Sequence, residues 1–165
     1  RATKSATTAT PSGAIALMRS TLPSPYSTGV APRSDRRAWF DVGAVGFLFG
    51  FIPHVFFADQ AAELIGWPKG SMFQFEVGLH DGGWGILGFL CVFFGGGFWL
   101  ATAIGWSFFM FGAAWGHVRE LIVGNYAPYN LMPAFTDTFI PLYLLGLLYA
   151  YWRAGGLDSK LRPET

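Results

Sequence analysis

The feature that most constrains the fold of this chain is a set of four long apolar stretches separated by short polar or glycine-rich connections. A helix needs roughly 20 apolar residues to cross the hydrocarbon core of a bilayer, and each stretch is close to that length. Inside a bilayer the backbone polar groups must bond to one another, and a helix satisfies them within a single segment. The predicted membrane spans are residues 41–58, 72–94, 98–118 and 131–152.

The composition and the placement of charge indicate the class of protein. Charged residues make up 13% of the chain, whereas a typical soluble domain has about 25%. The sequence therefore predicts an all-α integral membrane protein, a four-transmembrane-helix bundle with its N- and C-termini on the same side. Both tails are rich in basic residues, and the positive-inside rule then places them in the cytoplasm, stroma or matrix.

The two ends of the chain differ in composition from its middle. We divide the sequence into a basic, Ser/Thr/Pro-rich N-terminal extension at residues 1–40, a four-helix membrane domain at 41–153 and a polar C-terminal tail at 154–165. The extension is similar in composition to an organellar transit peptide or to the segment behind its cleavage site. A generic disordered polar tail is the alternative. We expect the extension to dock on partner subunits.

Prolines and small residues predict how the helices are shaped and packed. Pro53 and Pro141 lie inside predicted spans and predict kinks, because proline removes a helical hydrogen bond. Helices in lipid associate through close packing, and small residues at four-residue spacing let two backbones approach. Such pairs on the first three spans are Gly46 with Gly50, Gly78 with Gly82, Ala101 with Gly105, and Gly112 with Gly116.

The stretch EVGLHDGGWGILG at residues 76–88 places three polar side chains, Glu76, His80 and Asp81, inside the second span. Asp137 is a further intramembrane polar residue, in the fourth span. A charge at the bilayer centre costs at least ~2.5–3.5 kcal/mol, so these groups are either paired or functional. One interpretation is structural, with hydrogen bonds from the second helix to polar residues of the fourth helix and the loop before it. Those partners are Asn125, Tyr126, Thr136 and Asp137.

Two functional interpretations compete with the structural one. In the first, a neutral imidazole ligates the metal of chlorophyll or haem, and the candidate cofactor-binding residues are His80, His54 and His117. In the second, Glu76, His80, Asp81 and Asp137 form a proton or ion path with titratable groups at successive depths. His80 is the first candidate for a metal or pigment ligand.

Several classes of site are not supported by the sequence. The single cysteine, Cys91, excludes an intrachain disulfide and a cysteine-based metal cluster. Glu76 and His80 share a helix face but lack a third ligand for a protein-bound metal site. No nucleophile has a base beside it, and no glycine loop has the lysine of a phosphate site. The formal net charge of +1 gives no reason to expect a nucleic-acid partner, and we expect no enzyme activity.

Several short motifs between His54 and Trp152 resemble those of a known group of membrane proteins. The motifs are AAELIGWP, FQFEVG, GGWGILG, FWLATAIG, GAAWGHVRE, the NYAP loop followed by Asn130, and an aspartate followed by IP in the fourth span. They resemble an uncharacterised family of small four-helix bacterial membrane proteins that is loosely DoxX-like, here with an added N-terminal extension. The resemblance implies a four-helix fold and carries no activity and no catalytic residues.

The combined expectation is an accessory, non-catalytic membrane subunit of a large energy-converting complex, with a structural and pigment-contacting role. A basic, hydroxyl-rich leader on a bacterial-type core favours a photosynthetic complex such as a photosystem in the plastid thylakoid membrane. The mitochondrial and bacterial inner membranes are the alternative locations. The expected cofactors are chlorophyll or carotenoid, otherwise lipid only, and the expected partners are other membrane subunits and lipids. The alternative function is a small proton or solute transporter, or a membrane redox protein, that uses polar groups on helices two and four.

Overall fold

The structure, a computed structural model, describes residues 33–157, and all regular structure in that part of the chain is helical. Residues 1–32 and 158–165 lie outside the described residues. They hold most of the predicted extension and tail. The expected docking of the extension on partner subunits therefore also lies outside the described residues. The elements are α2 (Arg33–Val45), the π-helical η1 (Gly46–Phe51), α3 (Ile52–Phe56), α4 (Ala58–Ile65), α5 (Met72–Leu90), α6 (Gly97–Ile122) and α7 (Pro128–Arg153).

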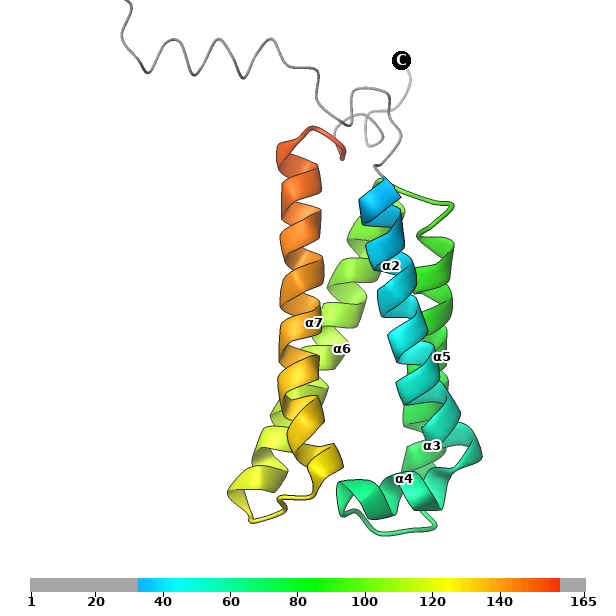
Figure 1. Ribbon diagram of the computed structural model, residues 1–165, viewed down its shortest axis with the longest axis vertical. Helices are drawn as coiled ribbons and strands as arrows, with labels where there is room; N and C mark the ends of the chain where they lie inside the picture. Colours follow the sequence, from blue (N-terminus) through cyan, green and yellow to red (C-terminus); the bar gives the residue numbers. More distant parts are fainter. Residues whose placement is uncertain (1–32, 158–165) are drawn as a thin grey trace, which may run out of the picture.

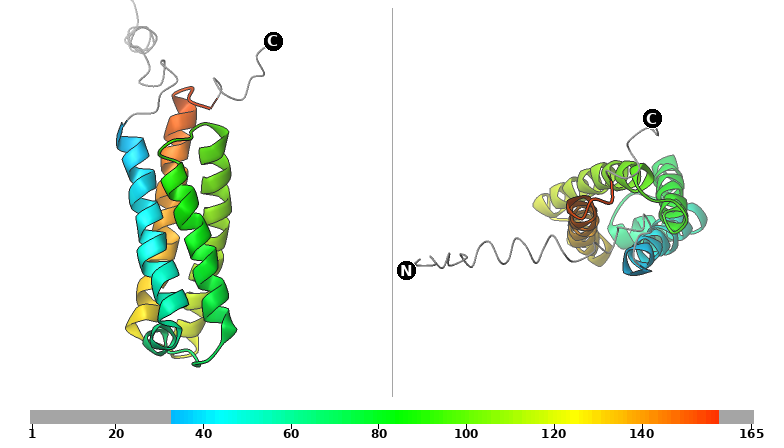
Figure 2. Two further views of the ribbon diagram at one scale, coloured as in Figure 1. Left: turned by 90° about the vertical axis from the view of Figure 1, so that its right-hand side faces the viewer. Right: turned by 90° about the horizontal axis from the view of Figure 1, so that it is seen from above.

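The long helices run alongside one another, and the short helix α4 lies across one end of them (Figure 1, Figure 2). The segments α2, η1 and α3 follow one another as one rod, which packs mainly against α5, while α6 packs mainly against α7. We call these the first pair and the second pair. Helix α2 begins and α7 ends at the same end of the molecule, the α2 end (Figure 1). The opposite end, with α4 and the α6–α7 loop, is the α4 end.

Three helical segments are long and apolar enough to cross a membrane: Asp35–Phe56, Gly97–Ile122 and Pro128–Arg153. They match the first, third and fourth predicted spans and indicate an integral membrane protein. The second predicted span also forms a helix, α5, of 19 residues. It is not among the three, because Gln74, Glu76, His80 and Asp81 lower its hydropathy. A bundle of four membrane spans is therefore only partly confirmed.

The start of the first span differs most from its prediction. Helix α2 begins at Arg33, inside the segment that the sequence assigns to the extension. Its first turn is polar, but the next turns bury Trp39 and Val42, which are 1% and 7% exposed. These two side chains fix the beginning of the rod against the other helices, so the helix continues outward beyond the apolar stretch itself.

The irregularity predicted at Pro53 takes the form of a π turn. Pro53 has no N–H to donate to the carbonyl of the residue four positions earlier. Just before it, the wider η1 turn bonds the Ile52 N–H to the Phe47 carbonyl, five positions away. The rod thereby remains helical to Phe56. No break accompanies the kink predicted at Pro141, since α7 is helical throughout.

Glycines bring the first pair into backbone contact. A Cβ atom added to Gly88 would lie 2.6 Å from Gly43 Cα, and one added to Gly43 would lie 2.9 Å from the Gly85 carbonyl oxygen. The small-residue pairs predicted on the first two spans also lie where the rod packs against α5. Gly105 of α6 faces the ring of Trp84. That part of the packing prediction is confirmed. It is wrong for the fourth pair, because no atom lies within 4 Å of a Cβ built on Gly112 or Gly116.

Aromatic side chains fill the space between the two pairs toward the α2 end. Trp39, Trp99 and Trp106 are at most 2% exposed. Trp99 contacts Trp39 at 5.8 Å and Tyr151 at 5.0 Å between ring centroids, and its indole N–H donates to the Cys91 carbonyl at 2.8 Å. Trp106 stacks on Trp84, with centroids 6.4 Å apart. We call Trp39, Trp84, Trp99, Trp106 and Tyr151 the aromatic core.

Candidate functional site: a polar cluster between the helix pairs

Polar side chains gather between the pairs from the α4 end to about the middle of the helices. Gln74, His117 and Asn130 are buried, and the others are half-buried. They come from α3, α5, α6 and α7, so every long segment contributes at least one. The members of this polar cluster are His54, Gln74, Asp81, His117, Asn130 and Asp137.

His117 is the centre of the cluster. Its ring stacks on Trp67, with centroids 5.8 Å apart and an interplanar angle of 4°. Its Nδ1 lies 2.8 Å from Asn130 Oδ1, and its Nε2 lies 4.0 Å from Asp137 Oδ2. One imidazole thus connects the loop after α4 with both helices of the second pair.

The hydrogen bonds of Asn130 decide which nitrogen of His117 carries the proton. Asn130 Nδ2 donates to the Asn125 carbonyl at 2.8 Å and to the His117 carbonyl at 3.4 Å. Its Oδ1 must therefore accept, and His117 Nδ1 donates to it. In the neutral ring the unprotonated nitrogen is then Nε2, which faces the Asp137 carboxylate.

A second asparagine ties the α6–α7 loop to α4. Asn125 Nδ2 donates to the Ile65 carbonyl at 3.0 Å and to Glu120 Oε2 at 3.1 Å. Its Oδ1 accepts from the Ala127 N–H at 3.2 Å. The side chain therefore satisfies three groups that would otherwise need water, and it holds the α4 end of both pairs together.

Replacing Asn125 with alanine is expected to lower the free energy of unfolding by about 1–2 kcal/mol, the cost of losing half-buried hydrogen bonds. The measurement is the thermal melting of the purified protein in detergent. Tyr126→Ala is the matched control, because the neighbouring Tyr126 side chain is 73% exposed. Equal melting temperatures for the two variants would contradict the role given to Asn125.

The first pair supplies the other half of the cluster. His54 Nδ1 is hydrogen-bonded to Gln74 Oε1. Asp81 lies directly against the rod: a Cβ atom on Gly50 would be 2.5 Å from Asp81 Oδ2. Any larger residue at Gly50 would displace this carboxyl group. The absence of a side chain at Gly50 therefore lets a polar group sit between two helices that are in close contact.

The two pairs also interact electrostatically across the cluster. Asp81 and Asp137 are close enough to repel each other when both are charged, and His54 and His117 interact in the same way. Thr136 Oγ1 donates to Asp137 Oδ1 at 3.1 Å. Pro141 cannot donate to the Asp137 carbonyl, which leaves a backbone acceptor beside the acid.

The predicted site residues divide into two groups. His54, His117, Asp81 and Asp137 meet in the polar cluster. Glu76 and His80 do not, because both are exposed on the other side of α5.

The His80 ring packs on Phe109 at 4.2 Å and on Trp84 at 5.8 Å between centroids. It borders a shallow hollow whose other lining residues are Leu79, Gly83, Trp84 and Leu87. The structural interpretation expects hydrogen bonds from Glu76, His80 and Asp81 to the loop and the fourth helix. Within residues 33–157 the loop and α7 are bonded instead through Asn125, to Ile65 and Glu120, and through Asn130, to His117.

Sequence reasoning did not select Gln74, Asn130 or Trp67 as site residues. Gln74 and Asn130 are 2% and 0% exposed. An amide at either position inside or beside an apolar stretch was the available signal, since buried amides require partners. Within residues 33–157, no group of three or more His, Cys, Asp and Glu side chains is arranged to hold a metal ion. The polar side chains of the cluster are held by hydrogen bonds, such as the one between His117 and Asn130.

The aromatic core closes the cluster on the side of the α2 end. The ring of Trp106 and the backbone of Asp81 both lie beside Gly46: a Cβ atom there would be 3.0 Å from the ring and 3.6 Å from the Asp81 carbonyl oxygen. The indole N–H of Trp106 is buried and has no hydrogen-bond partner. The polar groups therefore extend from the α4 end to the middle of the molecule and meet a layer of tryptophans there.

Comparison with known proteins gives a family for the chain. The sequence model of a family of unknown function, DUF6790, matches residues 13–156 and so extends into the predicted N-terminal extension. No curated protein and no solved structure matches the chain. The match provides no link to DoxX-like proteins, and that part of the resemblance stays a prediction. Because the match spans most of the sequence, the chain belongs to the DUF6790 family, whose function is unknown.

Proposed function

We propose that this protein is a small membrane transporter that moves protons through the polar cluster. The observation that carries the proposal is the pairing of His117 Nε2 with Asp137 Oδ2 at 4.0 Å. Asp81 of the other pair is close enough to interact electrostatically with Asp137. Ionisable groups inside membrane segments are rare and commonly mark proton pathways. Here a base and two acids follow one another from the α4 end toward the middle of the helices.

The proposal includes four membrane spans. Helix α5 has 19 residues and is about 28 Å long at 1.5 Å per residue, close to the ~30 Å thickness of a hydrocarbon core. It lies beside the other long helices (Figure 2). Its polar residues Gln74 and Asp81 face the rod rather than lipid, which reduces the cost of placing it in the membrane.

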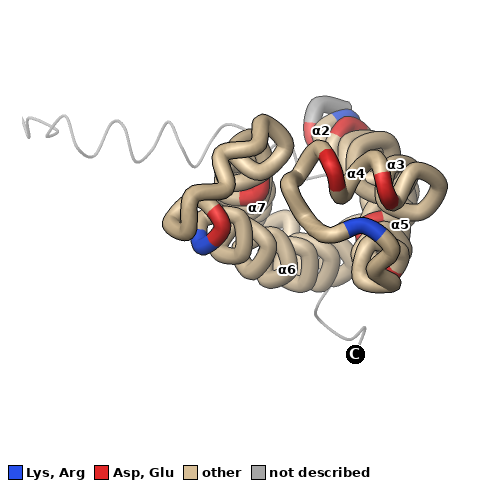
Figure 3. Tube along the Cα trace, turned by 90° about the horizontal axis from the view of Figure 1, so that it is seen from below, with Lys and Arg blue, Asp and Glu red and all other residues tan. Residues whose placement is uncertain are grey.

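The charges at the two ends support one orientation. The α2 end carries Arg36, Arg37 and Arg153, with Asp35 and Asp41 as acids. The α4 end, seen in Figure 3, carries the acids Asp59, Glu63 and Glu120 beside Lys69 and Arg119. Lys69 donates to Glu63 at 2.6 Å, which raises the pKa of Lys69 and offsets its charge. By the positive-inside rule the α2 end, and with it both tails, faces the cytoplasm or its organellar equivalent.

The aromatic core indicates how such a transporter works. Trp84 and Trp106 stand between Asp81 and the α2 end, so protons cannot pass along a continuous row of polar groups. The two pairs must shift against each other to hand a proton on. This mechanism predicts slow, carrier-like transfer instead of the high rates of an open channel.

The test is proton flux into liposomes that contain the full chain and a trapped pH-sensitive dye, with a potassium gradient and valinomycin to balance charge. We expect the protein to accelerate pH equilibration over empty liposomes. Asp137→Asn and Asp81→Asn should each slow it by roughly 100-fold or more, the usual effect of removing a positioned proton carrier. Glu76→Gln is the matched control, because it removes an exposed acid from the same helix as Asp81. Equal flux in wild type and both aspartate variants would end this proposal.

A second candidate function is the accessory, pigment-contacting subunit predicted from the sequence, and the placement of His80 favours it. Its exposed imidazole makes ring contacts with Phe109 and Trp84 and no hydrogen bond within residues 33–157. Beside it, Gly83 has no atom within 4 Å of a Cβ position, so a flat ring system has room to approach. A chlorophyll held there by His80 would suit a photosynthetic complex in a thylakoid membrane.

The absorption spectrum of the native particle tests this second function. A bound chlorophyll would give red absorption bands that His80→Ala shifts or removes, whereas His54→Ala would leave them in place because His54 is bonded to Gln74. A colourless particle without partner subunits would rule it out.

A further inference from the structure

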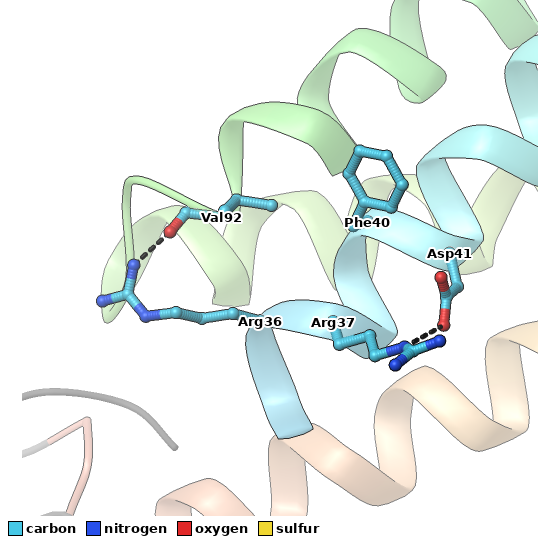
Figure 4. Close-up of a pocket in the computed structure, with 5 residues that line it drawn as sticks. All are labelled: Arg36, Arg37, Phe40, Asp41 and Val92. Carbon is cyan, nitrogen blue, oxygen red and sulfur yellow. Dashed lines mark hydrogen bonds and ion pairs between the residues drawn. The ribbon is translucent and has the colours of Figure 1, made fainter. Parts of the chain in front are cut away.

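The α2 end has an open pocket whose walls combine two guanidinium groups with apolar surface. Its lining residues are Arg36, Arg37, Phe40, Asp41 and Val92 (Figure 4). Four of them come from the first three turns of α2, and Val92 follows the end of α5. We propose that this pocket binds the headgroup of an anionic phospholipid.

The position of the pocket matches the headgroup layer. The first candidate span begins at Asp35, so Arg36 and Arg37 lie where the rod enters the membrane. Phe40 lies one turn further along and is 50% exposed, while Phe93, next to Val92, is 75% exposed. These rings mark the level at which acyl chains begin. A lipid with its phosphate on the arginines would place its chains on the phenylalanines.

The two arginines have donors left for a phosphate. Arg36 donates one N–H to the Val92 carbonyl, and in Figure 4 its guanidinium points toward Val92 while that of Arg37 points toward Asp41. A guanidinium has five N–H groups and binds phosphate through parallel hydrogen bonds. Arg37 pairs with Asp41 at 3.7 Å, but both side chains are strongly exposed, at 83% and 61%. Such surface pairs are weak in water, and a phosphate can replace the carboxylate.

The charge around the pocket favours an anion in spite of the nearby acids. Asp35 and Asp41 are balanced by Arg36 and Arg37 on the same helix. The Arg153 end of α7 lies at the same end of the molecule (Figure 1). Anionic headgroups gather on the membrane face that attracts basic segments. The α4 end, with three acids and two basic residues near its surface, has no comparable attraction.

The test is native mass spectrometry of the full chain in detergent, titrated with phosphatidylglycerol or with phosphatidylcholine. We expect phosphatidylglycerol to bind the tighter of the two. Each arginine contributes about fivefold to that preference, and the Arg36→Gln/Arg37→Gln variant should lose about 25-fold. The matched control, Lys69→Gln/Arg119→Gln at the α4 end, should keep the preference. Unchanged discrimination in the first variant would overturn the site.

Two further measurements keep the test decisive. Because Arg36 also connects α2 to Val92, the double variant carries a risk of misfolding. Arg37→Gln alone breaks no contact between helices and should still weaken phosphatidylglycerol binding about fivefold. Inorganic phosphate at low millimolar concentration should leave the lipid bound, because it lacks the chains that cover Phe40. Displacement by phosphate would show a free-anion site and overturn the assignment to lipid.

Discussion

Replacing His117 with alanine is expected to lower the free energy of unfolding by about 3 kcal/mol, the sum of two losses. Asn130 Oδ1 and the groups around it would remain buried without their partner, at a cost of about 1–3 kcal/mol. The stacked ring of Trp67 would also lose its neighbour, at about 0.5–1.5 kcal/mol. The residue is 8% exposed, so water cannot readily replace it. Melting in detergent should fall by roughly 10 °C.

Two control variants separate the parts of this effect. His80→Ala removes the same side chain from an exposed position and should cost only the ring contacts with Phe109 and Trp84, about 0.5–1.5 kcal/mol of the free energy of unfolding. His117→Phe keeps a ring against Trp67 but cannot donate to Asn130, and it should recover only part of the loss. If the His117→Ala and His80→Ala variants have the same melting temperature, His117 does not hold the polar cluster.

Replacing Gly88 with alanine should destabilise the first pair by about 2–3 kcal/mol, the usual cost of overpacking. The new methyl group would sit 2.6 Å from Gly43 Cα and 3.0 Å from its backbone nitrogen. Neither is a flexible side chain, so α2 and α5 would have to move apart. The loss should appear as a lower melting temperature and as wider separation of spin labels placed on the two helices.

Gly83→Ala is the matched control for this change. Gly83 lies on the same helix, but no atom lies within 4 Å of its Cβ position. The substitution there should stabilise the protein by up to ~1 kcal/mol, because alanine is the better helix former. A loss of stability for Gly88→Ala together with a gain for Gly83→Ala would establish the backbone contact. Changes in stability of the same sign would refute it.

The helices were predictable because their signals are local, whereas the site was only partly so. Apolar length and turn residues place α6 and α7 within a few residues of their observed bounds. However, which polar side chains of α5 point into the polar cluster depends on which face of α5 packs against the rod. The glycines contain that information: Gln74, Gly78, Asp81 and Gly85 fall on one helical face, while Glu76 and His80 fall on another. The role of His117 was not predictable, since it requires Trp67 from the loop after α4 and Asn130 from α7.

The pairing of the helices has a consequence for the order in which the chain folds. His54 finds Gln74 within the first pair, and His117 finds Asn130 and Asp137 within the second. Each pair therefore supplies hydrogen-bond partners for most of its own polar side chains without the other pair. Contacts that are close in sequence form early, so each pair can form before the two pairs pack together. Docking of the finished pairs would then bring Asp81 beside Asp137 and complete the site only in the fully assembled protein.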